Sequence, residues 1–184
     1  MTNTNGMMVE LCIPPEWARI DPVRQAVGLC VVAVFANDDL RDALGMVCAE
    51  LLENAIKYGK PDPQGVLVRL VERRAGDRRE VVLSVTNAVE EASHHLSALR
   101  QRIAWIKSFG SASEAYMSAL TQVYERSDAQ GGESGLGLVR IAYEGNCSLD
   151  CEEPIEGFMQ VRAQYLLDAS GAILIEPNPD EASS

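Results

Sequence analysis

One helical pattern, between residues 38 and 58, constrains the fold more than any other feature of the chain. Apolar residues recur there at spacings of three and four, which predicts a helix with one side packed in a core. They are Leu40, Leu44, Val47, Leu51, Ala55 and Tyr58. Glu50, Asn54 and Lys57 follow the same spacings. We therefore expect a polar stripe of three side chains beside the apolar stripe, on one helix face.

The polar stripe has two interpretations. A carboxylate can take a proton from a hydroxyl, an amide oxygen can bind Mg²⁺, and an ammonium group can meet phosphate. Glu50, Asn54 and Lys57 would then suit a nucleotide site. The alternative is a solvated helix face, in which Glu53 and Lys57 form an ordinary surface ion pair four residues apart. This segment alone leaves both interpretations open.

A glycine-rich segment at residues 131–138 favours the first interpretation. It reads Gly-Gly-Glu-Ser-Gly-Leu-Gly-Leu, and a short apolar helix is expected after it, up to Gly145. Glycines let a backbone approach a ligand closely, and free amides at a helix start attract phosphate. A flexible loop with an ordinary helix is the alternative. The order of the two motifs, with strands between them, favours a functional role.

Together the two motifs resemble the GHKL ATPase superfamily, most closely its anti-sigma-factor serine/threonine kinases. Residues 50–58 resemble the N box of that family, and residues 135–138 resemble its second glycine box. The resemblance covers roughly residues 7–167 and implies a Bergerat fold. The Asp-x-Gly-x-Gly box of the family is missing, because Asn87 stands in place of the Asp and no glycine follows it.

The resemblance implies a role for each site residue. Glu50 would be the general base on a protein hydroxyl, and Asn54 would hold Mg²⁺ against the triphosphate of ATP. Lys57 would assist at the phosphates, and Asn87 would face adenine through its amide oxygen. The backbone that would cradle the phosphates lies at Gly132, Gly135, Leu136 and Gly137. The implied cofactors are therefore ATP and Mg²⁺.

Three functions follow from these features. The resemblance implies an ATP-binding, partner-switching serine/threonine kinase or anti-sigma-like regulator in bacterial signalling, whose partner would be a sigma factor or an anti-anti-sigma type protein. The missing adenine box motivates the alternative, a degenerate GHKL-like protein-binding module that no longer binds ATP. The third is a dimerisation domain appended to a signalling system, motivated by the first helix.

That first helix is expected from Asp21 to Ala36, and its residues are nearly all apolar from Ala26 on. Such a helix must be buried on most sides or paired with another chain. We therefore expect a homodimer with this helix at or near the interface; the alternative is that the N-terminal segment, the two-helix insert or the C-terminal tail covers it. Val27 and Val34 are expected to point outward from the domain.

The remaining patterns predict an α/β two-layer sandwich, in which a mixed, mostly antiparallel sheet has its helices on one face. The expected strands are residues 7–13, 65–73, 80–86, 146–152 and 157–167. Two further helices are expected at residues 90–107 and 111–126.

The expected domain organisation is simple. Residues 7–167 would form one GHKL ATPase-like domain, in which residues 88–130 are a two-helix insert that replaces the ATP lid of the family. Residues 1–6 would be a disordered N-terminus. Residues 168–184 would be a C-terminal tail, with a strand at 172–175.

The composition excludes several classes of function. The formal net charge of −11 would repel nucleic-acid phosphates and anionic membrane surfaces. The longest apolar run, residues 26–36, is too short to span a bilayer, and the N-terminus does not read as a signal peptide. The five cysteines fall in apolar contexts and are expected to be reduced core residues. We expect a cytoplasmic protein.

Overall fold

A computed structural model describes residues 6–75, 78–90, 92–126 and 136–174. Five strands in this part of the chain form one sheet in the order β1-β2-β3-β5-β4. The strands are β1 (Met8–Ile13), β2 (Val66–Ala75), β3 (Arg78–Ala88), β4 (Ser148–Glu152) and β5 (Phe158–Leu167). Each pair of neighbouring strands is antiparallel. The predicted two-layer α/β sandwich is confirmed, with antiparallel pairing throughout the described sheet.

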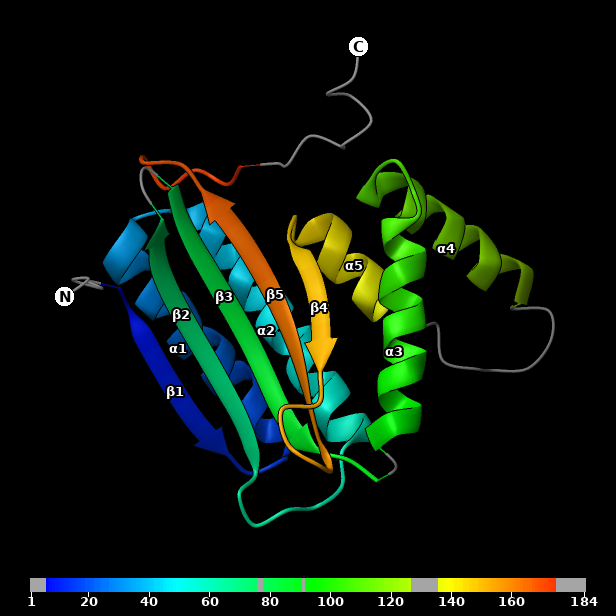
Figure 1. Cartoon of the computed structure of the whole chain (residues 1–184). Coiled ribbons are helices and arrows are strands. Elements are labelled where there is room, and N and C mark those ends of the chain that lie inside the picture. Colours follow the sequence, from blue (N-terminus) through cyan, green and yellow to red (C-terminus); the bar gives the residue numbers. More distant parts are fainter. Residues whose placement is uncertain (1–5, 76–77, 91, 127–135, 175–184) are drawn as a thin grey trace.

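The helices α1 and α2 lie behind the sheet, and α5 follows them toward β4 (Figure 1). Helix α3 stands beyond the β4 edge and packs on β4 and α5, while α4 is outermost and packs on α5. The bounds are α1 (Ile20–Phe35), α2 (Asp38–Tyr58), α3 (Ala92–Lys107), α4 (Ala112–Arg126) and α5 (Gly137–Glu144), with a short 3-10 turn, η1 (Trp17–Arg19). Two helices thus occupy the predicted insert. That they replace an ATP lid stays a prediction.

The hydrophobic core lies between the sheet and the first two helices. Side chains alternate along β3 and β5, so that one face of the sheet is buried and the other is partly exposed. The α2 stripe meets this buried face through Leu40, Leu44, Val47, Leu51 and Ala55. Each fully buried Leu or Val contributes about 1.5–3 kcal/mol. The predicted stripe is confirmed as far as Ala55, whereas Tyr58 is 39% exposed.

Asn37 joins the start of α2 to the turn that follows β5. Its Oδ1 accepts a hydrogen bond from the backbone N–H of Leu40 at 2.9 Å, which caps the helix. Its Nδ2 donates to the carbonyl oxygen of Gly171 at 2.9 Å. Residues 168–174 turn back along β5, and an isolated bridge joins Leu167 to Ile173. The expected strand at 172–175 is therefore a single bridge in the described residues, and residue 175 lies outside them.

The first helix forms as expected, but the prediction of which residues face outward from it is partly wrong. Val27 is 1% exposed and faces the core with Val23, Val31 and Phe35, so the prediction that Val27 points outward is wrong. The reason is that a helix with apolar residues on every side has no contrast from which to read its rotation. The outward apolar residues are Leu29, Val32 and Val34, which are 72%, 37% and 39% exposed.

Among the helices that the structure describes, none is both long and apolar enough to cross a membrane.

Candidate functional site

The first turn of α5 lies directly against the polar stripe of α2. A Cβ atom added at Gly137 would lie 3.1 Å from Glu50 Oε2 and 3.9 Å from Asn54 Nδ2. Glycine permits this close approach because it has no side chain there. The structure therefore brings the two sequence motifs together, with Glu50, Asn54 and Gly137 in one cluster.

Glu50 is the titratable group of this cluster. Its side chain is 18% exposed, and its Oε1 accepts a hydrogen bond from Arg140 Nη1 at 2.9 Å. Burial raises the pKa of Glu50 above its ordinary value, Arg140 opposes that rise, and Glu53 and Glu144 add to it. A carboxylate with a raised pKa is a better proton acceptor at neutral pH than an ordinary surface glutamate.

Arg140 is a member of the cluster that sequence reasoning missed. It stands in the first turn of α5 and also donates from Nε to Glu144 Oε2 at 2.9 Å. Glu50 lies 90 residues earlier in the chain, so no local pattern connects the two side chains. The available signal was the spacing of three residues from Gly137, which puts both residues on one side of the helix.

Asn54 offers the chemistry expected of a Mg²⁺ ligand. Its side chain is partly buried beside Gly137. No group of three or more His, Cys, Asp or Glu side chains that could hold a metal occurs among the described residues. Mg²⁺ at a nucleotide site commonly takes only one or two protein oxygens and completes its shell with phosphate oxygens and water. An amide oxygen from Asn54 fits that arrangement.

Lys57 and Leu136 lie at the margins of this cluster. Lys57 is exposed, and its ammonium group lies 5.3 Å from the ring centroid of Tyr58. Leu136 precedes α5 and is partly buried, and its carbonyl oxygen accepts from the backbone N–H of Arg140 at 2.8 Å. The other two predicted phosphate-binding residues, Gly132 and Gly135, lie outside the described residues.

Asn87 lies at the other end of the polar stripe, where β3 meets the end of α2. Asn87 is 4% exposed, and its Nδ2 donates to the carbonyl oxygen of Ala88 at 3.1 Å. A Cβ atom at Gly59 would lie 2.8 Å from that nitrogen. Gly59 has an ordinary φ of −78°. The same Cβ position would lie only 2.3 Å from the carbonyl oxygen of Ala55, so close approach to Ala55 and Asn87 explains this glycine, rather than the left-handed cap that often ends a helix.

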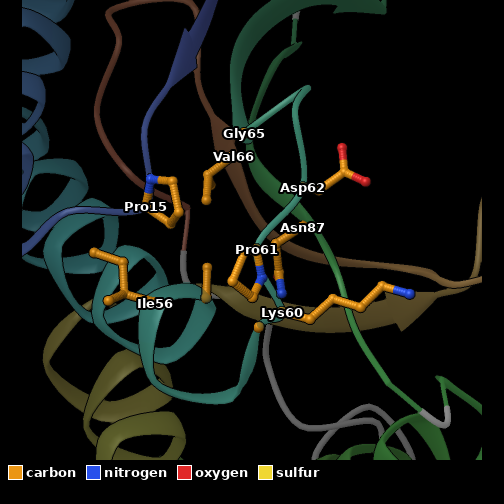
Figure 2. Close-up of a pocket in the computed structure, with 10 residues that line it drawn as sticks. Pro15, Ile56, Lys60, Pro61, Asp62, Gly65, Val66 and Asn87 are labelled. Carbon is orange, nitrogen blue, oxygen red and sulfur yellow. The ribbon is translucent and has the colours of Figure 1, made fainter.

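Asn87 also lines a small pocket of about 110 Å³ at the end of α2. Figure 2 shows Pro15 and Ile56 on one side of it, while the Lys60 side chain extends away on the other. Ala55 and Gly59 of the α2 end complete the wall beside Asn87. The structure thus groups Asn87 with the residues that directly follow Asn54 on the helix.

The helical insert contacts the same α5 helix that holds Arg140. Tyr116 of α4 stacks on Tyr143 of α5, with ring centroids 4.8 Å apart and planes inclined by 20°. Stacked aromatic pairs of this kind contribute about 0.5–1.5 kcal/mol beyond their burial. The insert is therefore attached to the helix that completes the cluster.

Comparison with known proteins identifies a shared fold. No protein-family model matches the chain, and no curated protein matches it. Among solved structures, it is similar to a chain in the crystal structure of the SiaB–SiaC complex from Pseudomonas aeruginosa. The TM-score is 0.56 at 18% sequence identity, and the match covers 86% of this chain and 89% of the other. This likeness shows a common fold over most of both chains.

Proposed function

We propose that this protein is an ATP-dependent serine/threonine kinase of the GHKL type that regulates a partner protein. The contact of Gly137 with Glu50 and Asn54 is the observation that supports it best. Two motifs separated by some eighty residues meet where the resemblance expects base, metal ligand and phosphate-binding backbone. Phosphoryl transfer depends mainly on positioning and charge neutralisation, so a short set of residues suffices.

Each residue has a stated task in this proposal. Glu50 accepts the proton of the attacking hydroxyl, and its raised pKa suits that task. Asn54 holds Mg²⁺, which supplies positive charge at the phosphates. The start of α5 offers backbone amides to the phosphates. Asn87 accepts a hydrogen bond from adenine at the end of the same helix.

A protein partner completes the proposal. The similar fold occurs in a complex of two proteins, SiaB and SiaC, which supports a partner for this chain as well. We expect that partner to be a sigma factor or an anti-anti-sigma type protein that bears the hydroxyl. The five cysteines are all free, which suits a cytoplasmic location.

Calorimetric titration with ATP and Mg²⁺ tests the nucleotide site. We expect a dissociation constant of about 1 μM or weaker, equivalent to about 8 kcal/mol or less, because Asn87 replaces a charged adenine acceptor. Asn54→Ala should lose this binding, whereas Glu53→Gln, a change at an exposed position of the same helix, should keep it. No heat at millimolar ATP would contradict the kinase and favour the protein-binding module without ATP, for which the uncharged Asn87 is the supporting observation.

We further propose that the protein forms a homodimer through α1. Leu29 and Val32, three residues apart, leave exposed apolar side chains on its outer side, and Val34 is partly exposed on another side of the helix. Leu29 borders a groove of about 500 Å³ between α1 and α2, which Met46 also lines. Arg24 and Arg41 line the same groove and pair with Asp21 and Asp38. The surface therefore has both charge signs, so two copies of it can face each other without net charge repulsion.

Light scattering over a range of concentrations tests the dimer. We expect twice the 20.0 kDa chain mass for the wild-type protein. Leu29→Glu should give a folded monomer, because it puts a charge into the apolar interface. Met117→Glu is the matched control, since Met117 is a 60% exposed apolar residue on α4. A wild-type monomer at high concentration would rule the dimer out.

A further inference from the structure

Arg140 lies between two carboxylates that differ in their surroundings. Its Nη1 donates to Glu50 Oε1 and its Nε donates to Glu144 Oε2, both at 2.9 Å. The Glu50 side chain is 18% exposed, whereas those of Arg140 and Glu144 are 46% and 38% exposed. The arginine therefore joins a largely buried carboxylate of α2 to a solvated one on its own helix.

The two hydrogen bonds come from different nitrogens of one planar group. Glu144 is four residues after Arg140, so it holds Nε from the same helix face. With Nε fixed, the rigid guanidinium plane also fixes the direction of Nη1, which points to α2. A lysine at this position would keep the charge, but it could not donate two hydrogen bonds in fixed directions from one planar group.

The hydrogen bond from Arg140 uses one carboxylate oxygen of Glu50 and leaves the other for further partners. Arg140 occupies Oε1, while Oε2 is the oxygen that lies 3.1 Å from a Cβ position at Gly137. Oε2 therefore faces the start of α5, where the proposed function expects the phosphates and the attacking hydroxyl. Arg140 selects this orientation by holding the opposite oxygen.

We propose that Arg140 is a positioning residue for phosphoryl transfer, which keeps the Glu50 carboxylate ionised and turns its Oε2 toward Gly137. The inference rests on the proposed function, because it explains how Glu50 acts as a base. In the transfer, the hydroxyl proton moves to Glu50, the hydroxyl oxygen bonds to the γ-phosphorus of ATP, and the bond from that phosphorus to the bridging oxygen breaks, which releases ADP. The proton remains on Glu50 until solvent removes it.

The charges around Glu50 show why such a residue is needed. Glu53 on α2 and Glu144 on α5 both disfavour ionisation of Glu50, and burial disfavours it most. Arg140 is the group that opposes them through its charge and its hydrogen bond. Without Arg140, Glu50 would hold its proton to a higher pH than it does in the wild-type protein.

Carbon-detected NMR titration of protein labelled at the glutamate carboxyls tests this inference without nucleotide. The Glu50 resonance is assigned by its loss in Glu50→Gln. We expect the pKa of Glu50 to rise in Arg140→Gln relative to wild type. Arg162→Gln is the matched control, because Arg162 also bridges two carboxylates, Asp150 and Glu152, and should leave Glu50 unchanged. An identical Glu50 titration in wild type and Arg140→Gln would overturn the role of Arg140.

The second measurement is the pH profile of Mg-ATP hydrolysis, with water as the acceptor hydroxyl. In Arg140→Gln the acid limb of kcat should move to higher pH, and kcat at neutral pH should fall about ten- to hundredfold, as for loss of a charged hydrogen bond. Arg140→Lys should restore the limb but not the full rate, and it serves as the test if Arg140→Gln does not fold. An unmoved limb in both variants overturns the inference, whereas an inactive wild-type protein whose Glu50 pKa responds to Arg140 overturns the proposed kinase instead.

Discussion

Two glutamates lie in largely buried positions next to an arginine, and they differ in how fully they are neutralised. Glu72 on β2 is 4% exposed. It accepts hydrogen bonds from Arg79 Nε at 2.7 Å and from the backbone N–H of Met7 at 3.3 Å, and Arg74 lies 3.6 Å away. Burial acts to raise the pKa of Glu72, but these partners together lower it below the ordinary value.

Glu50 has the opposite balance. It has one arginine, Arg140, which it shares with Glu144, and burial outweighs that partner, so its pKa is raised. A saturated carboxylate such as Glu72 is suited to hold two strands and the N-terminal segment together. An under-neutralised carboxylate such as Glu50, beside a glycine backbone, is suited to exchange a proton. Glu72 is therefore part of a structural ion pair, whereas Glu50 is the carboxylate that suits the proposed site.

The largest expected effect is on catalysis. Glu50→Gln should lower phosphoryl transfer about 100- to 10,000-fold, the usual contribution of a general base, and leave Mg-ATP binding nearly intact. Glu72→Gln should keep transfer per folded molecule, because Glu72 belongs to the structural pair. Transfer and binding are measured on the same preparations. Equal losses in both variants would mean that the two carboxylates do not have separate roles.

The second-largest expected effect is on stability, and here the change at Glu72 should matter more than the change at Glu50. Glu72→Gln should lower the free energy of unfolding by about 2–3 kcal/mol, because the hydrogen bonds lose their charge and Arg79 loses its counter-ion. Arg79 also lies 4.1 Å from the ring centroid of Phe35, so its displacement affects α1. Glu50→Gln should lower the free energy of unfolding by a smaller amount, since it also removes a buried charge. Urea unfolding of the two variants decides the order.

The pH dependence of stability sharpens the contrast further. The pKa of Glu72 is lower in the folded state than in the unfolded state, so its stabilisation is present above the ordinary glutamate pKa of about 4.3 and is lost as pH falls through the folded value. The pKa of Glu50 is higher when folded, so its contribution is present below that ordinary value and is lost as pH rises through the folded value. The difference in free energy of unfolding between wild type and Glu72→Gln should therefore grow with pH. The same difference between wild type and Glu50→Gln should shrink with pH. Slopes of the same sign would refute the assignment.

The helix that holds Glu50 was predictable, whereas the partners of both glutamates were not. The apolar spacing predicted which face of α2 is buried, as far as Ala55. The meeting of Gly137 with Glu50 was expected only from the family resemblance. The pairs Glu50–Arg140 and Glu72–Arg79 depend on packing between different elements, which local sequence patterns do not encode. The predicted orientation of Val27 on α1 was wrong for a related reason, because the apolar residues of that helix lie on every side and do not show which side is buried.

The smallest expected effect comes from one methyl group at the site. Gly137→Ala would put its Cβ 3.1 Å from Glu50 Oε2, so the carboxylate must shift or lose contact with water. We expect the pKa of Glu50 to rise, because added burial disfavours its charge. Stability should change by less than about 1 kcal/mol, since alanine is the better helix former.

Gly28→Ala is the control for Gly137→Ala. It is also a helical glycine, and its added Cβ would lie 3.2 Å from the side-chain Cγ of Arg41, away from the site. It should change stability by a similar amount and leave the titration of both Glu50 and Glu72 unaltered. If Gly137→Ala leaves the Glu50 titration as unaltered as Gly28→Ala does, α5 does not press on Glu50 in solution. The raised pKa of Glu50 would then not come from its contact with the start of α5.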